Sequence, residues 1–187
     1  MIVTHAELAA EIRRHAYLEG DFVLRSGKCS SYYLDKYRFE TRPELLRALG
    51  ERIAEEVAEH APEAARLAGP ELGAVALAAA GSLASGLPFL LVRKEAKVYG
   101  TAQRIEGVFE EGEEVCVVED VVTSGGALIS SVEALREAGL VCRTAVCVVD
   151  REEGGVDELA RHAVRLRPLY TASQIVGAAE GAANPHG

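Results

Sequence analysis

Apolar residues recur along this chain in patterns that predict alternating helices and strands. Positions three to four residues apart predict helices at 4–18, 42–60 and 127–135, and a run of small residues predicts a further helix at 74–85. Short runs rich in apolar, often β-branched residues predict buried strands at 67–69, 88–92, 115–118 and 141–149. This alternation is typical of an α/β protein whose central, mostly parallel sheet is flanked by helices.

Three further segments have less regular patterns. Residues 22–35 contain two apolar runs around a Ser-Gly-Lys turn, which predicts a β-hairpin. Residues 108–114 predict a hairpin-like approach to the strand at 115–118. Near the C-terminus we expect residues 164–166 and a short helix around 173–179 to cover the sheet edge, and residues 181–187 to fray.

Composition narrows the class of protein. A chain of 187 residues, 49% of them hydrophobic, is expected to form one domain with a substantial core. It contains no apolar run near the ~20 residues needed to cross a bilayer, and its N-terminal residues do not resemble a secretory signal. The four cysteines lack C-x-x-C spacing, and Cys116 and Cys147 fall inside predicted strands, which predicts a reducing cytoplasm and no structural zinc. A net charge of −9 argues against a broad nucleic-acid surface.

The segment 115–127, VCVVEDVVTSGGA, carries the most chemistry. Its apolar strand is followed by Glu119 and Asp120, then by Thr123-Ser124-Gly125-Gly126 at the start of a predicted helix. Glycines leave backbone amides uncovered, and a helix N-terminus favours a phosphate. The acidic pair suits ribose hydroxyls or a developing positive charge beside that phosphate. A solvated acidic turn with no such role explains the same spacing equally well.

The same segment resembles the phosphoribosyl pyrophosphate (PRPP) binding motif of type I phosphoribosyltransferases. Both have four apolar residues, two acidic, two apolar and then Thr-x-Gly. The resemblance implies the fold of that family over 1–187 as a single domain, in which about 1–40 and the C-terminal segment form a hood over the base. It implies that PRPP is bound by Glu119, Asp120, Val121, Val122, Thr123, Ser124, Gly125, Gly126 and Ala127.

Three other segments resemble orotate phosphoribosyltransferases. They are F-x-L-x-S-G-K-x-S-x-Y from Phe22, R-K-x-x-K-x-x-G from Arg93 and D-R-x-x-G from Asp150. Taken alone, the first is consistent with an ordinary edge hairpin, the second with a solvated loop and the third with a surface charge. Together with segment 115–127 they stand in the order of the family, between about Phe22 and Arg151.

The resemblance implies roles for individual residues. The implied catalytic residues are Lys97, Lys94, Arg93, Asp120 and Glu119. The charged loop adds Arg93, Lys94, Lys97 and Tyr99 to the PRPP ligands, although Tyr99 stands where many bacterial members have a histidine and supplies no cation. The implied orotate ligands are Arg25, Tyr32, Tyr33, Thr123 and Arg151, with the Arg151 fork on the orotate carboxylate. The turn 69–73 is expected beside the pyrophosphate, but it lacks the basic residue often found there.

The implied reaction is orotate plus PRPP to orotidine 5′-monophosphate plus pyrophosphate, a step of de novo pyrimidine synthesis. It implies Mg²⁺ carried by PRPP oxygens and water, with no metal ligand from the protein. The family further implies a cytoplasmic homodimer whose charged loop completes the neighbour's site, with no nucleic acid or membrane partner. Two alternatives stay open: transfer to another base, such as a purine, and a PRPP-sensing regulator that binds RNA on the same fold.

Overall fold

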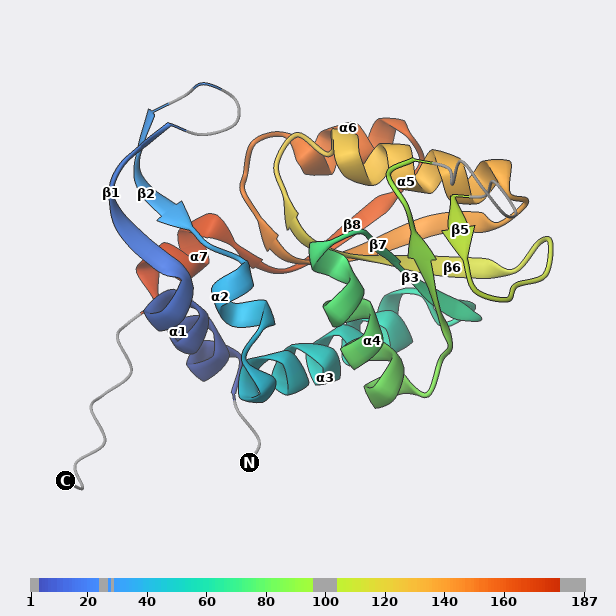
Figure 1. Ribbon diagram of the computed structural model, residues 1–187, viewed down its shortest axis with the longest axis horizontal. Coiled ribbons are helices and arrows are strands. Elements are labelled where there is room, and N and C mark those ends of the chain that lie inside the picture. The colour runs from blue at the N-terminus through green and yellow to red at the C-terminus, as the bar shows by residue number, and fades with distance from the viewer. Residues whose placement is uncertain (1–3, 24–26, 28, 96–103, 179–187) are drawn as a thin grey trace.

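The structure is a computed structural model that describes residues 4–23, 27, 29–95 and 104–178 (Figure 1). Its centre is a six-stranded sheet with the strand order β5-β4-β3-β6-β7-β8. The strands are β3 (Arg66–Pro70), β4 (Phe89–Val92), β5 (Ile105–Glu106), β6 (Glu114–Val122), β7 (Val141–Asp150) and β8 (Arg165–Thr171). Every neighbouring pair is parallel except β4 and β5. The predicted mostly parallel central sheet is therefore confirmed.

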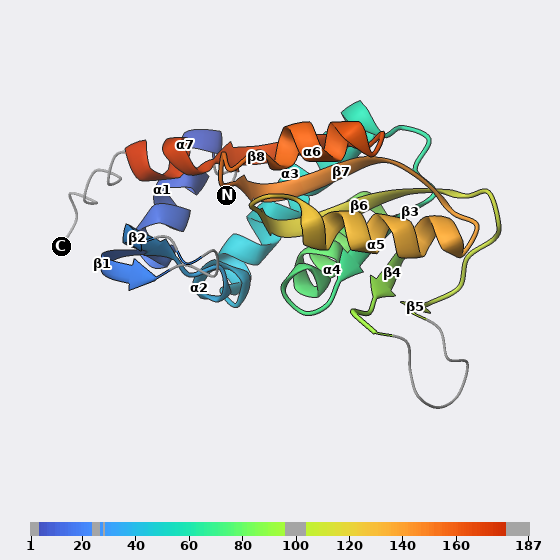
Figure 2. The ribbon, with the colours of Figure 1, turned by 90° about the horizontal axis from the view of Figure 1, so that it is seen from above.

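Helices cover both faces of this sheet (Figures 1 and 2). The helices α3 (Pro43–His60) and α4 (Gly73–Ser85) cover one face, and α5 (Gly126–Glu137) and α6 (Gly155–Arg161) cover the other. Two hydrophobic clusters fill the layers, and β6 contributes Val118 to the first and Val117 to the second. Because β6 is buried on both faces, its sequence shows a continuous apolar run rather than alternation.

A small antiparallel hairpin stands apart from the main sheet (Figure 1). It consists of β1 (Tyr17–Val23) and β2 (Cys29–Leu34) and is followed by the short helix α2 (Tyr37–Glu40). The helix α1 (His5–Ala16) leads into it and packs against α2 and against α7 (Ala172–Gly177). A hydrogen bond from Nε of Arg13 to the carbonyl of Val176, 3.1 Å long, joins α1 to α7. The N-terminal hairpin and the C-terminal helix thus lie at the same end of the molecule.

Several predicted boundaries were wrong. The first helix ends at Ala16 rather than at residue 18, and the first hairpin strand begins at Tyr17 rather than at residue 22. The strand β6 runs on through the acidic pair to Val122, because β7 continues beside it there. Residues 108–109 do not pair with β6. The strand β3 occupies that edge of β6, and β5 pairs with β4 instead.

Two short helices, α2 and α6, were not predicted, because four and seven residues are too few to show a helical period. Residues 164–166, expected to cover the sheet edge, lead into β8, which is itself the edge strand because it pairs with β7 from Arg165 to Thr171. The last helix spans Ala172–Gly177 rather than 173–179. The expectation of fraying at 181–187 lies outside the described residues. Among the helices that the structure describes, none has both the length and the hydropathy needed to cross a membrane.

Candidate active site

A cavity of about 800 Å³ opens at the carboxyl edge of the central sheet. The strand order reverses between β3 and β6, and such a switch point is where ligands bind in parallel α/β sheets. The cavity wall combines residues from β2, from the segment between β6 and α5, and from the loop after β7. These residues are Tyr33, Glu119, Val121, Val122, Thr123, Ser124, Gly125, Gly126, Ala127, Leu128, Arg151, Glu152 and Glu153.

The segment Thr123–Gly126 forms the predicted turn between β6 and α5. Gly125 has φ of 87°, a left-handed conformation that glycine adopts without a steric penalty, and it is the residue before α5. Thr123 and Ser124 are exposed at the turn. The first amides of the 12-residue helix α5 follow immediately, so the turn presents the donors and the positive helix end that suit a phosphate.

The loop after β7 supports this turn directly. A Cβ added at Gly155, the first residue of α6, would lie 2.5 Å from the carbonyl oxygen of Thr123 and 2.5 Å from Cγ1 of Val122. Only a glycine allows α6 to begin this close to the turn. The position of the phosphate turn therefore depends on a residue about thirty positions further along the chain.

Glu119 lines the cavity and is buried, with 8% of its surface exposed. Its Oε1 accepts a hydrogen bond of 3.0 Å from the backbone N–H of Asp120. Burial raises the pKa of Glu119, and the negative charge of Asp120 raises it further. The interpretation of the acidic pair as a solvated turn is therefore wrong, because the pair lies within β6 rather than after it.

Asp120 is 3% exposed and is not among the residues that line this cavity. Its Oδ2 accepts a hydrogen bond from Nζ of Lys36 at 2.5 Å, and its Oδ1 accepts one from the N–H of Val121 at 2.5 Å. A Cβ added at Gly73 would overlap the Asp120 carboxylate. The Asp120 side chain thus extends from β6 to a position between the start of α4 and Lys36, the residue that precedes α2.

Glu40 is a third buried carboxyl group beside this pair. It is 3% exposed, and its Oε1 has no hydrogen-bond partner among the described residues. Burial raises the pKa of Glu40 to about 8, and the charge of Asp120 acts in the same direction while Lys36 acts against it. The carboxyl edge of β6 is therefore a cluster of buried acids, not a single pair.

The turn 69–73 and the start of the charged loop meet nearby. The peptide bond between Glu71 and Leu72 is cis. Oε1 of Glu71 accepts a hydrogen bond of 2.6 Å from the backbone N–H of Lys94, and the N–H of Arg93 donates to the carbonyl of Arg104 at 2.8 Å. Neither Arg93 nor Lys94 lines the described cavity. Lys97 and Tyr99 lie outside the described residues.

The predicted orotate ligands meet in part. Tyr33 and Arg151 line the cavity, and the guanidinium carbon of Arg151 lies 5.5 Å from the centre of the Tyr32 ring. The Arg151 side chain is 10% exposed, its Nη2 lies 3.6 Å from Oε1 of Glu153, and its buried Nε has no hydrogen-bond partner among the described residues. Arg25 lies outside the described residues. The structure thus brings Tyr33, Thr123 and Arg151 to one cavity, with Tyr32 beside Arg151.

Comparison with known proteins decides the family. No protein-family model matches the chain. The orotate phosphoribosyltransferase of Methanocella arvoryzae is 49% identical over 158 residues, which cover 84% of this chain and 89% of that protein. The chain belongs to the orotate phosphoribosyltransferase family. The family predicted from the four sequence segments is thereby confirmed.

Solved structures of the orotate phosphoribosyltransferase family share the fold. The enzyme from Aeropyrum pernix superposes with a TM-score of 0.81 at 34% identity, over 92% of this chain and 96% of that one. The enzyme from Mycobacterium tuberculosis in complex with PRPP gives a TM-score of 0.78 at 28% identity, over 92% and 98% of the two chains. The predicted fold, a mostly parallel sheet flanked by helices with a small N-terminal hairpin, is confirmed.

Sequence reasoning assigned no role to Lys36, Glu40 or Gly155. Lys36 is one of only four lysines in an acidic chain and directly follows the hairpin, which is a weak signal of a special position. Glu40 and Gly155 gave no signal, because their burial depends on packing between distant segments. Among the described residues, no three His, Cys, Asp or Glu side chains come together as a metal-binding cluster.

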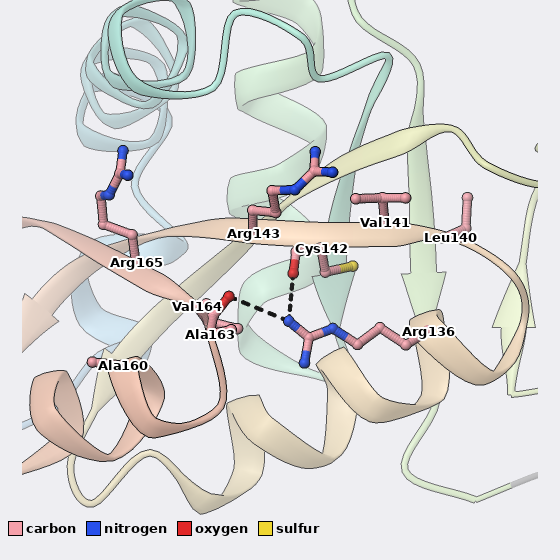
Figure 3. Close-up of a pocket in the computed structure, with 9 residues that line it drawn as sticks. All are labelled: Arg136, Leu140, Val141, Cys142, Arg143, Ala160, Ala163, Val164 and Arg165. Carbon is pink, nitrogen blue, oxygen red and sulfur yellow. Dashed lines mark hydrogen bonds between the residues drawn. The ribbon is translucent and has the colours of Figure 1, made fainter.

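A second cavity, of about 710 Å³, lies where β7 and β8 begin (Figure 3). Arg136 reaches into it from α5 and donates to the carbonyls of Cys142 at 2.6 Å and His162 at 2.9 Å. The guanidinium groups of Arg143 and Arg165 lie on the other side of β7 (Figure 3). These arginines do not converge on one point, so the cavity has no common anion position.

Proposed function

We propose that this chain transfers the 5-phosphoribosyl group of PRPP to orotate, giving orotidine 5′-monophosphate and pyrophosphate in pyrimidine synthesis. One observation carries the proposal. The phosphate turn Thr123–Gly126, the carboxyl group of Glu119 and the guanidinium of Arg151 all line a single cavity. The turn suits the 5′-phosphate of PRPP, the carboxyl group of Glu119 suits its ribose, and the guanidinium of Arg151 suits the carboxylate of orotate. One cavity thus offers groups for both substrates of the transfer.

The 5′-phosphate binds at residues 121–127. Its oxygens accept hydrogen bonds from the amides of the turn and from the hydroxyls of Thr123 and Ser124, next to the positive end of α5. This contact holds the sugar in place while its C1 reacts. Fixing the reacting atoms in this way lowers the entropic part of the barrier.

Glu119 and Asp120 act on the ribose. As the bond from C1 to the pyrophosphate oxygen breaks, positive charge develops on the sugar ring. The carboxylate charge next to the ring favours this state, and the carboxyl oxygens accept hydrogen bonds from the ribose hydroxyls. Because both groups sit in a buried environment, their interaction with the developing charge is stronger than it would be in water.

Arg93, Lys94 and Lys97 act on the leaving group. Pyrophosphate departs with additional negative charge, which cationic side chains stabilise most in the transition state. The backbone of the turn 69–73 and the hydroxyl of Tyr99 add hydrogen-bond donors. We propose that Mg²⁺ enters on the phosphate oxygens of PRPP, where it also neutralises charge, because Mg²⁺ prefers phosphate and water oxygens.

Orotate is held by its carboxylate and its ring. The planar fork of Arg151 suits a bidentate contact with a carboxylate. Glu153, which lies beside Arg151 in the structure, gives up this contact when the substrate carboxylate arrives. Tyr32, Tyr33, Thr123 and Arg25 surround the ring. As N1 of orotate bonds to C1 of the ribose and the bond from C1 to the pyrophosphate oxygen breaks, the N1 proton passes to water or to the departing pyrophosphate.

An assay of pyrophosphate release tests this proposal. The purified chain with PRPP and Mg²⁺ is expected to release pyrophosphate only when orotate is present, and Lys97→Ala is expected to lower kcat far more than the orotate KM. Adenine, hypoxanthine and uracil serve as alternative acceptors. Release with a purine but not orotate supports the other-base alternative, whereas salt-sensitive RNA binding without release supports the regulator.

We further propose a homodimer in which the charged loop of one subunit completes the site of the other. The resemblance supports it, and so does the observation that Arg93 and Lys94 do not line the cavity of their own chain. Mixing a Lys97→Ala variant with an Asp120→Asn variant should restore activity, because a hybrid dimer has one site with both groups intact. No recovery after demonstrated subunit exchange would contradict loop sharing.

The hood over the base is proposed to comprise about 1–40 and the C-terminal segment. Tyr33 of the hairpin lines the cavity, and the hydroxyl of Tyr170 donates a hydrogen bond of 2.9 Å to the carbonyl of His5, which ties the two ends of the chain together. We also propose a cytoplasmic location. In support, all four cysteines are free thiols, and Cys116, Cys142 and Cys147 are buried.

A further inference from the structure

Lys36 makes the closest polar contact between the N-terminal segment and the acidic strand β6. It directly precedes α2, and its Nζ lies 2.5 Å from Oδ2 of Asp120, which is 84 residues away in the chain. The Lys36 side chain is 31% exposed and that of Asp120 is 4% exposed. A Cβ added at Gly73 would lie 3.0 Å from Nζ and would overlap the carboxylate. The pair is thus wedged against the first residue of α4.

The surroundings of the pair are strongly acidic. The titratable groups that face it are Glu119 on β6, Glu40 and Tyr37 on α2, Asp35 just before α2, and Cys147 on β7. Lys36 is the cation whose charge acts on both Glu40 and Glu119. Burial disfavours its ammonium form, but the hydrogen bond and the charge of Asp120 outweigh this and leave the pKa of Lys36 above its ordinary value.

We propose that Lys36 is a positioning residue for the transfer reaction, which fixes the Asp120 carboxylate beside Gly73 and supplies the positive charge that faces three buried carboxyl groups. The proposal rests on the transfer reaction proposed above. Lys36 acts through Asp120 and need not touch the substrates. It also connects α2, β6 and the start of α4. The segment that follows the hairpin therefore influences the charge of the acidic cluster formed by Glu40, Glu119 and Asp120.

The charge balance of the cluster explains why the cation is needed. Three carboxyl groups in one buried region cannot all ionise without a large electrostatic penalty, because like charges disfavour each other in a low dielectric. Burial raises the pKa of Glu40 to about 8 and also raises the pKa of Glu119, so both groups resist ionisation. Among the described residues, the ammonium of Lys36 pairs with the Asp120 carboxylate and lies 5.3 Å from the centre of the Tyr37 ring. Its charge also acts on Glu40 and Glu119, so this cation opposes the repulsion within the cluster.

The test is the pH dependence of kcat/KM for PRPP. In Lys36→Met, the buried acidic cluster loses the cation that faces it and takes up a proton at higher pH. The acid limb of the profile should therefore move up by about one to three pH units. Activity at neutral pH should fall about tenfold or more, and the loss should shrink towards pH 9. Lys36→Arg keeps the charge and should retain the wild-type acid limb.

Two further variants test whether the charge of Lys36, rather than its hydrogen bond or any cation on this segment, sets the acid limb. Lys36→Gln can still donate a hydrogen bond to Asp120 but carries no charge, and it should shift the acid limb as Lys36→Met does. Arg38→Met removes a cation from α2 that pairs with Asp35 on the surface, at 3.4 Å, and should leave the profile unchanged. An unshifted acid limb in both neutral Lys36 variants, or a Lys36→Arg profile shifted as far as theirs, overturns the proposal.

A double-mutant cycle on folding does not depend on activity. Lys36→Met and Asp120→Asn each leave one buried group without its partner, so each should raise the unfolding equilibrium constant. The double variant should fall at least about tenfold short of the product of the two single effects. Multiplicative effects would show that the pair is not coupled and would overturn the proposal. Coupling in a chain without pyrophosphate release would instead count against the transfer reaction alone.

Discussion

The two ends of the central sheet hold cavities of similar size, about 800 Å³ at the carboxyl edge and 710 Å³ at the amino edge. Their charged groups differ in burial. At the carboxyl edge, Glu119 lines the cavity and is buried, as is Asp120 beside it, and Arg151 has a buried nitrogen without a hydrogen-bond partner among the described residues. At the amino edge, Arg136, Arg143 and Arg165 are exposed. The two cavities thus differ little in volume, and the one at the carboxyl edge is set apart by the buried carboxyl group of Glu119 in its lining.

The direction of the helices explains the difference. Helix N-termini gather at the carboxyl edge of a parallel sheet and leave amides free for an anion. Helix C-termini gather at the amino edge and leave carbonyls free. Arg136 donates to such carbonyls, those of His162 and Ala163 after α6. Its guanidinium thus binds backbone carbonyls within the fold, whereas the guanidinium of Arg151 lines the cavity at the other edge.

The largest effect is expected for Asp120→Asn. Loss of this charge beside the developing cation should lower kcat about 100- to 1,000-fold, a range typical for one electrostatic contact in a transition state. Asp157→Asn removes an exposed carboxylate from the first turn of α6 and serves as the control. Steady-state kinetics at saturating PRPP and orotate measure both. A kcat within about tenfold of wild type would remove Asp120 from the proposed mechanism.

The next effect compares arginines from the two edges. Arg151→Ala should raise the orotate KM about 10- to 100-fold, because charge-assisted hydrogen bonds contribute about 1.5–3 kcal/mol. The KM for PRPP should change much less. Arg165→Ala removes an exposed arginine at the opposite edge and should leave both KM values within about twofold of wild type. Equal shifts in the two KM values of Arg151→Ala would contradict a carboxylate contact.

A smaller effect is expected for Gly155→Ala. The new methyl group would press on the carbonyl of Thr123 and on Val122, so the phosphate turn must shift. Overpacking of this kind costs about 1–3 kcal/mol, and we expect the PRPP KM to rise about tenfold. Gly177→Ala is the control, since a Cβ there meets no atom within 4 Å. An unchanged PRPP KM in Gly155→Ala would show that the turn yields without loss of binding.

The smallest effect concerns stability rather than activity. The pKa of Glu40 is raised from 4.5 to about 8 in the folded chain. Between these values the unfolded chain holds fewer protons, so this group lowers stability as pH rises, by up to about 1.4 kcal/mol per pH unit. Glu40→Gln cannot ionise, and its free energy of unfolding should fall less from pH 5 to pH 8 than that of the wild type.

Chemical denaturation at several pH values measures this difference. Glu111→Gln replaces an exposed acid and should follow the wild-type pH dependence. If Glu40→Gln ran parallel to the wild type, Glu40 would be ionised in the folded chain at neutral pH. The acidic cluster would then carry more charge than Lys36 can balance.

Local patterns in the chain were sufficient for the family, the alternation of helices and strands, and the phosphate turn. The segment 115–127 encodes its strand, turn and helix within thirteen consecutive residues, so neighbouring side chains and glycines dictate the local conformation. Arg151 was assigned through the resemblance of D-R-x-x-G to the family, because a basic residue after a buried strand is by itself consistent with a surface charge. Each of these inferences depends on residues that lie close together in the sequence.

Packing between distant segments set the remaining features. No local pattern indicates that Lys36 contacts Asp120 or that the Glu40 side chain is buried beside this pair. None indicates that Gly155 supports Thr123. The strand β5 pairs with β4 because β3 already occupies the edge of β6, which no property of residues 105–109 reveals. A residue's burial and its charged neighbours depend on which elements fold against it. The acidity of this site is therefore a property of the folded chain.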